Sequence, residues 1–175
     1  MADRSLLQRE LRQSKPFRTP AHEAALALFR TTDVLRRRLS QIIEHHGLTT
    51  QQFNVLRILR GAGDEGLPTL EVGNRLIEEA PGVTRLLDRL EARSLVRRER
   101  CPRDRRQHLC RITPAGLALL AGLDRELADA HDHVLRGLSA AQRKAFIRLL
   151  DAIRGAHEHP TNTTHSHPRQ SKGLL

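Results

Sequence analysis

Aromatic residues are scarce in this chain of 175 residues, which contains no Trp, no Tyr and only four Phe. A β-sandwich or a large barrel draws on aromatic and β-branched side chains, so this composition argues against both fold classes. It also argues against binding of single-stranded nucleic acid by base stacking, because that mode needs exposed aromatic rings. The chain is rich in Leu, Ala, Arg and Glu instead, which favours a mainly α fold.

Long apolar runs and a cysteine framework are also missing. No segment approaches the roughly 18 consecutive apolar residues of a membrane span, and residues 1–17 lack the apolar core of a signal peptide. We therefore expect a cytoplasmic protein whose two cysteines, Cys101 and Cys110, are reduced. The motifs H-E-x-x-H, G-x-S-x-G, Walker A and C-x-x-C are absent, so we expect no catalytic residue, no metal ligand and no cofactor.

Positive charge is abundant, and arginine supplies almost all of it. The 30 Lys+Arg residues, of which 27 are Arg, exceed 20 Asp+Glu and give a formal net charge of +10. Between Arg85 and Arg111 ten Arg outnumber four acidic residues, which is more than half of that excess. Since the guanidinium fork matches pairs of phosphate oxygens, this cluster points to a polyanion bound through its phosphates. An isolated charge run is usually only a solvated surface, and the position of this one weakens that interpretation.

Helical periodicity and capping signals divide the chain into five segments. Capping boxes at Thr49–Gln52 and Ser139–Gln142 mark two helix starts. The expected segments are a flexible N-terminal stretch (1–19), a long helix (20–46), a lobe of short elements (47–113), further long helices (114–156) and a disordered His-containing tail (157–175).

The lobe 47–113 reads as two short helices followed by a hairpin. Thr69 is expected to cap the first helix, and Pro81 to occupy the first position of the second. That second helix has an apolar side and a side bearing Thr84, Arg85, Asp88, Arg89 and Arg93. Two strands, Leu95–Cys101 and Gln107–Ile112, flank an Arg-bearing tip. This order predicts a winged helix-turn-helix with a small β-hairpin wing, which places a helix in the major groove of double-stranded DNA and the wing in the minor groove.

Four short stretches carry a family resemblance: Thr84–Glu91 (T-R-L-L-D-R-L-E), Leu95–Arg98, Asp104–Arg106 and Ile112–Gly116 (I-T-P-A-G). Their order and spacing resemble the MarR (multiple antibiotic resistance regulator) family of transcription factors, from about Gly47 to Gly116. The resemblance implies a homodimer held by interleaved N- and C-terminal dimerisation helices. It also implies a small-molecule-responsive regulator, most often a repressor. Ser94 departs from the family, which usually has Gly where this helix ends.

The resemblance also implies which residues contact DNA. The matching positions are Gly82, Thr84, Arg85 and Arg89 on the second helix, and Asp104 and Arg106 in the wing. Thr69, Pro81, Arg103 and Arg105 complete the expected DNA-binding set. Arg85 can contact a guanine edge or a phosphate, and Asp104 can brace Arg106. A dimer would read an imperfect palindrome with half-sites about one helical turn apart.

Histidine and cysteine leave alternatives open. His45 and His46 read as a helix C-terminus, with effector or metal contact as the alternative, and the tail histidines read as solvated rather than metal-binding. Nearby arginines can favour a thiolate, although strand pairing sets Cys101 and Cys110 apart. The remaining alternative functions are a non-specific or architectural nucleic-acid-binding protein and an enzyme with a His-based site.

Overall fold

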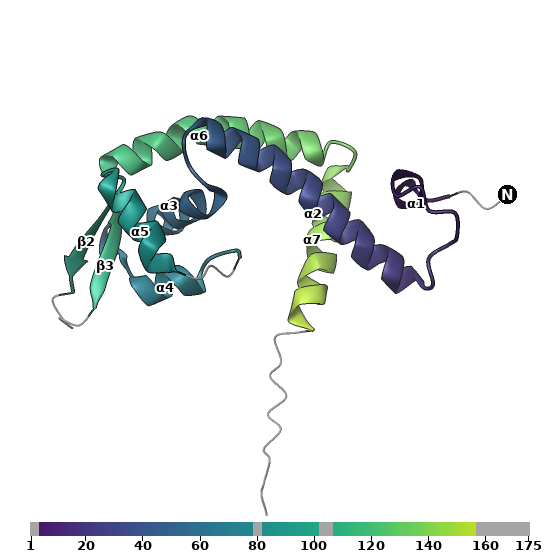
Figure 1. The fold of residues 1–175 in the computed structure, drawn as a ribbon, viewed down its shortest axis with the longest axis horizontal. Helices are drawn as coiled ribbons and strands as arrows, with labels where there is room; N and C mark the ends of the chain where they lie inside the picture. The colour runs from purple at the N-terminus through teal and green to yellow at the C-terminus, as the bar shows by residue number, and fades with distance from the viewer. Residues whose placement is uncertain (1–3, 79–81, 102–106, 157–175) are drawn as a thin grey trace, which may run out of the picture. The chain divides into compact units, whose positions relative to one another are not determined.

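The computed structural model describes residues 4–78, 82–101 and 107–156, in two compact units, Met1–Val134 and Leu135–Leu175. In the first unit the elements are α1 (Leu6–Glu10), α2 (Pro20–His45), α3 (Thr50–Ala62), the 3-10 helix η1 (Gly63–Glu65), β1 (Leu67–Pro68), α4 (Thr69–Asn74), α5 (Val83–Ala92), β2 (Val96–Arg100), β3 (His108–Ile112) and α6 (Pro114–Val134) (Figure 1). The second unit contains α7 (Ala140–Gly155).

Helix α2 begins and ends as its sequence indicates. The Thr19 hydroxyl accepts a hydrogen bond from the His22 amide, and Pro20 occupies the first helical position. His45 lies in the last turn, His46 is the C-cap, and Gly47 follows with a left-handed φ of 71°. The interpretation of the two histidines as a helix C-terminus is therefore confirmed.

The structure adds a short helix before α2. Helix α1 begins with a capping box. The Ser5 hydroxyl oxygen accepts a hydrogen bond from the Gln8 amide, and the Gln8 side-chain oxygen accepts one from the Ser5 amide. Leu7 is buried, and Glu10 pairs with Arg30 of α2 at 3.1 Å. Ser5–Gln8 has the same capping-box spacing as Thr49–Gln52 and Ser139–Gln142, but five residues are too few to display a helical period, so this helix was not predicted.

Aliphatic side chains fill the core of the first unit. Helix α3 lies against α2, α5, α6 and the sheet, and it buries Val55, Leu56 and Leu59 completely. The other fully buried large side chains of the described residues are Ile43, Val72, Leu87, Leu90, Val96, Cys110, Leu120 and Leu123. Leucine and valine thus supply the packing that aromatic residues provide in many domains.

The predicted hairpin is confirmed, and a third strand joins it. Strands β2 and β3 pair antiparallel with Val96 opposite Ile112 and Arg98 opposite Cys110. Strand β1 pairs with the other edge of β3, so the strand order is β1-β3-β2. Strand β1 was not predicted, since two residues that include a proline cannot show alternation.

Two expected helix starts are corrected. Thr69 does not cap α4: it is the first helical residue, Pro68 holds the N-cap position, and no side chain caps this helix. Helix α5 begins at Val83 rather than Pro81, because Gly82 adopts φ 89° and serves as a left-handed N-cap. Pro81 itself lies outside the described residues.

Ser94 provides a test of how α5 ends. It adopts φ 57°, and the Ser94 and Leu95 amides bond to the Glu91 and Leu90 carbonyls as in a Schellman motif. We expect Ser94→Gly to raise the unfolding free energy by about 0.5–1 kcal/mol, because glycine adopts this conformation without steric cost. Urea denaturation checks the value. The control Ala92→Gly, at the last residue of the same helix, should lose up to about 1 kcal/mol, and equal effects at both sites would contradict the argument.

The second unit contains one described helix, α7, with several exposed apolar side chains. The Ser139 and Gln142 side chains form the predicted capping box at the start of α7. Ile147, Leu149 and Ile153 are all more than half exposed. Within the described residues, none of the helices has the length and apolar character needed to cross a bilayer.

Candidate nucleic-acid interface

Helix α5 presents a polar side away from the core. Leu86, Leu87 and Leu90 are buried, whereas Thr84, Arg85 and Arg89 are exposed. The aliphatic stem of Arg85 lies across the helix start, with its Cδ 3.8 Å from where a Cβ on Gly82 would stand. Amphipathicity on a 3.6-residue period separates the two sides, so packing of the leucines alone orients the two arginines outward.

A hollow of about 720 Å³ lies between the helix-turn-helix and the wing. Its lining residues are Pro68, Thr69, Leu70, Glu71, Thr84, Arg98, Gln107 and His108. They come from β1, the start of α4, the start of α5, β2, and the first residue of β3 with the residue before it. Glu71, which would disfavour a phosphate, is paired with Arg75 at 3.6 Å.

The described arginines between Arg85 and Arg111 differ in whether they have a hydrogen-bond or ion-pair partner in the structure. Arg93 donates to the Gly47 carbonyl at 2.5 Å, and Arg111 donates to the Asp64 carbonyl at 2.7 Å and to Glu99 at 2.5 Å. Arg97 also pairs with Glu99, at 3.4 Å. Within the described ranges, Arg85, Arg89 and Arg100 have no hydrogen-bond or ion-pair partner. The charge available to a ligand is therefore smaller than the sequence count, and α5 holds two of these three arginines.

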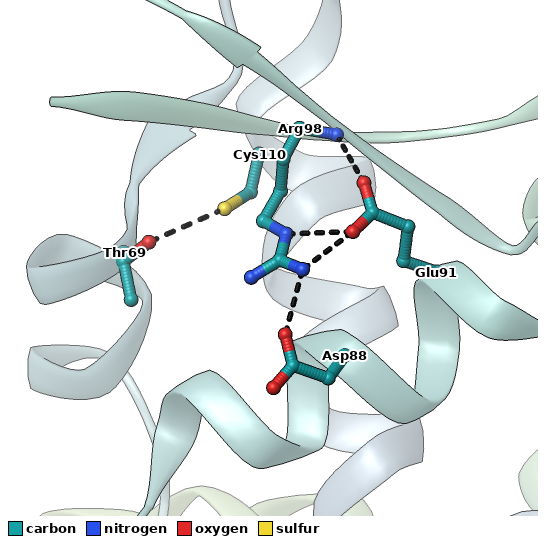
Figure 2. A network of polar contacts seen from close by, with 5 residues as sticks. All are labelled: Thr69, Asp88, Glu91, Arg98 and Cys110. Carbon is teal, nitrogen blue, oxygen red and sulfur yellow. Dashed lines mark hydrogen bonds and ion pairs between the residues drawn. The ribbon is translucent and has the colours of Figure 1, made fainter.

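Arg98 forms a separate network between the wing and α5 (Figure 2). Its guanidinium donates to Glu91 through Nε at 2.9 Å and Nη2 at 2.5 Å, and Nη2 lies 2.6 Å from Asp88 Oδ1. The Arg98 backbone amide donates to the other Glu91 oxygen at 3.0 Å. The hydrogen bonds from Arg98 lower the pKa of Glu91, and the same bonds raise the pKa of Arg98.

This network predicts a loss of stability in acid. Because the pKa of Glu91 is lower in the folded chain than its usual value of about 4.3, its contribution is complete above that value. The contribution is lost as the pH falls through the folded pKa. We expect the stability difference between the wild type and Glu91→Gln, measured by urea denaturation, to be largest near neutral pH and to shrink in acid. A difference that does not change with pH would contradict this.

Cys110 lies directly behind this network. It is fully buried, and its Sγ lies 3.6 Å from the Thr69 hydroxyl oxygen. Burial raises the pKa of the Cys110 thiol, which disfavours the thiolate that a redox role needs. Cys101 directly follows β2, and its amide donates to the Gln107 carbonyl, whereas Cys110 pairs with Arg98, so the two cysteines are not opposite each other, as expected.

A second cavity, of about 280 Å³, lies within the first unit. Most of its lining is apolar and comes from α2, α3, α6 and the connection after α4. Polar groups enter from Arg57, which stands over the Phe53 ring at 5.8 Å, and from Asn54 and His131. Its lining residues are Leu35, Leu39, Ile43, Thr50, Gln51, Phe53, Asn54, Arg57, Leu76, Ile77, Glu78, Leu127 and His131.

Comparison with known proteins of similar sequence and fold decides the family. Residues 46–107 match the family model described as the MarR family. The crystal structure of a MarR transcription factor from Planctomyces limnophilus is 38% identical and covers 78% of this chain and 99% of that one, with a TM-score of 0.60. This chain belongs to the MarR family.

Two further relatives agree with this assignment. The transcriptional regulator TtmR of Methylorubrum extorquens is 34% identical over 135 residues, which are 75% of this chain and 66% of that protein. The Bordetella bronchiseptica regulator BpsR, whose structure addresses regulation of its DNA binding by 6-hydroxynicotinic acid, is 29% identical. That match covers 75% of this chain and 98% of BpsR, with a TM-score of 0.66. MarR proteins are DNA-binding transcription regulators and not enzymes, so the expected winged helix-turn-helix fold and the absence of an enzymatic function are confirmed.

The structure brings part of the expected DNA-binding set together. Gly82, Thr84, Arg85 and Arg89 lie on one exposed side of the MarR helix α5, hereafter the recognition helix. Thr69 is half-buried beside them, with its hydroxyl directed to Cys110. Pro81, Arg103, Asp104, Arg105 and Arg106 lie outside the described residues. His108, an exposed residue that lines the hollow, was not among the predicted DNA-binding residues. Its position in the second strand of the hairpin is the one feature of the sequence that could have indicated it.

The histidines do not assemble a metal site among the described residues. His46 Nε2 lies 3.1 Å from Glu126 Oε1, which links the end of α2 to α6. In the described ranges no group of three His, Cys, Asp or Glu is placed to hold a metal ion. The tail histidines at 157, 159, 165 and 167 lie outside those ranges.

Proposed function

We propose that this protein is a homodimeric, sequence-specific repressor that binds an imperfect palindrome in double-stranded DNA and responds to a small molecule. Recognition helices would occupy successive major grooves about 34–36 Å apart, with the wings in the adjacent minor grooves. Such a regulator works beside the chromosome, so we infer a cytoplasmic location.

One observation carries the proposal: the recognition helix exposes two arginines that have no partner in the described part of the chain. Arg85 stands at the helix start, where backbone amides and the helix dipole attract a phosphate, and Arg89 follows one turn later. Thr84 lies beside them at the rim of the hollow that the wing shares. The proposed DNA-binding set is therefore Thr69, Pro81, Gly82, Thr84, Arg85 and Arg89 with the wing residues Arg103, Asp104, Arg105 and Arg106.

Exposed apolar side chains on the long helices support the homodimer. Phe29 of α2 is 74% exposed, Val34 of α2 is 45% exposed, and α7 exposes Ile147, Leu149 and Ile153. Large apolar side chains exposed on a helix surface in this way are typical of an interaction site. We propose 20–46 and 114–156 as the dimerisation helices and 47–113 as the DNA-binding lobe.

The apolar cavity supports regulation by a small molecule. It lies where α2 meets the DNA-binding lobe, and Leu76, Ile77 and Glu78, which lead into the recognition helix, form part of its wall. The related BpsR is regulated by 6-hydroxynicotinic acid. An apolar cavity with one arginine suits a compound of the same kind, a small planar organic acid. Binding there would shift the position of the recognition helix rather than perform chemistry.

Selection of bound sequences from random duplex DNA tests the proposal. The full chain should enrich one imperfect palindrome, and its affinity for that operator should exceed its affinity for random duplex by at least about a thousandfold at physiological salt. A second titration at higher salt measures the phosphate contribution. Equal affinity for all sequences would instead favour a non-specific or architectural DNA-binding protein and would overturn the proposal.

A further inference from the structure

The recognition helix carries two carboxylates among its arginines. Asp88 and Glu91 are three residues apart and therefore on one side of the helix, and their side chains are 51% and 37% exposed. Asp88 directly precedes Arg89, a residue of the proposed DNA-binding set. Uncompensated carboxylates at this position would repel a phosphate backbone and oppose the arginines beside them.

Arg98 of β2 compensates both carboxylates at once. One guanidinium nitrogen, Nη2, lies 2.6 Å from Asp88 and 2.5 Å from Glu91. Nε and the backbone amide of Arg98 bond to Glu91 as well, so that both oxygens of this carboxylate are occupied. Charge-assisted bonds from a rigid fork fix direction as well as distance.

The backbone of Arg98 is itself fixed from behind. Arg98 pairs across the sheet with Cys110, which is fully buried and contacts Thr69 at the start of α4 (Figure 2). One position on β2 is therefore connected to the recognition helix through its side chain and to α4 through its strand partner. A rotation of the recognition helix against the wing would break the ion pairs with Arg98.

We propose that Arg98 is a positioning residue for DNA binding: it holds Asp88 and Glu91 against the wing, and so lets Arg85 and Arg89 face the DNA without opposing charge. This inference rests on the proposed function. Arg98 also lines the hollow beside Thr84, and direct contact with a phosphate is the competing role. Its side chain is only 23% exposed, compared with 51% for Asp88, which favours the positioning role.

A charge-neutralisation series separates the two roles. The operator affinity of the wild type, Arg98→Met and the triple variant Arg98→Met/Asp88→Asn/Glu91→Gln is measured by fluorescence anisotropy at several salt concentrations. We expect Arg98→Met to lose at least about tenfold in affinity, because like charges then face the phosphates. The triple variant should regain most of that loss, and the salt slope should match the wild type because no phosphate contact has been removed.

Arg100→Met is the matched control, since Arg100 lies on the same strand and has no partner among the described residues. Adding Asp88→Asn and Glu91→Gln to Arg100→Met should restore nothing that Arg100→Met loses. Failure of the triple Arg98 variant to regain affinity would overturn the proposal. So would a salt slope reduced by about two units in Arg98→Met, which is the signature of one lost phosphate contact in each protomer of the proposed homodimer.

A further variant guards against simple unfolding. Melting temperatures are recorded for each chain, and Arg98→Lys keeps the charge but replaces the fork by a single ammonium. Arg98→Lys should bind the operator with an affinity between those of the wild type and Arg98→Met, and with an unchanged salt slope. If Arg98→Met is unfolded, Arg98→Lys provides the test, and an affinity as poor as that of the unfolded chain would overturn the positioning role. A wild-type chain that selects no sequence would overturn the proposed function first, and the inference with it. Selective wild-type binding with no effect of the Arg98 variants would overturn the inference alone.

Discussion

Arg85→Ala is expected to weaken operator binding by at least about thirtyfold and to leave binding of random duplex much less affected. A guanidinium that forms two hydrogen bonds to guanine contributes about 1–3 kcal/mol, and the proposed homodimer would lose that contribution twice. The side chain is exposed, has no partner among the described residues and stands at the start of the recognition helix. Its removal therefore leaves no buried group unsatisfied, so stability should change by less than about 0.5 kcal/mol.

Two comparisons sharpen the Arg85 result. Arg125→Ala removes the same charge from an exposed position on α6 and should leave operator affinity nearly unchanged. Arg106→Ala, in the wing, should weaken binding more evenly across sequences, because minor-groove and phosphate contacts carry less base information. Selection with the Arg85→Ala chain then shows whether preference is relaxed at one base pair, as a guanine contact requires. If neither Arg85→Ala nor Arg106→Ala affects binding, the groove assignment is wrong.

Local signals made the fold predictable from the sequence. The capping boxes at Thr49 and Ser139, the leucine period of α5 and the pairing of β2 with β3 each depend on residues close together in the sequence. Features that depend on distant partners were not predictable. The contact of Thr69 with Cys110 joins residues 41 positions apart, so the expectation that Thr69 caps its helix had no competing evidence.

The candidate site was predictable in its location but not in its electrostatics. Counting charges between Arg85 and Arg111 correctly drew attention to α5 and the wing. The count treated every arginine as free to bind a phosphate. In the structure Arg93 donates to the Gly47 carbonyl between α2 and α3, Arg111 donates to the Asp64 carbonyl of η1, and Arg98 pairs with two carboxylates. Which arginines are engaged depends on the angle between α5 and β2, which follows from core packing that the sequence does not display.

The second large effect is expected at Gly116, where α6 passes close to the sheet. A Cβ at this position would stand 2.4 Å from the Leu95 carbonyl oxygen and 2.7 Å from Ile112 Cγ1. Thr113 fixes the same crossing, because its amide donates to the Leu95 carbonyl and its hydroxyl donates to the Ser94 carbonyl at 2.7 Å. Backbone cannot move aside as a flexible side chain can, so Gly116→Ala should cost about 3 kcal/mol of unfolding free energy.

Gly122→Ala is the matched control for Gly116→Ala, because it makes the same substitution six residues later in α6 with no atom within 4 Å of the new Cβ. That variant should gain about 1 kcal/mol, since alanine favours a helix over glycine. The two variants should therefore shift the urea midpoint in opposite directions. If Gly116→Ala is instead as stable as Gly122→Ala, the close approach of α6 to Leu95 does not restrict this position, and the glycine of the I-T-x-x-G pattern needs another explanation.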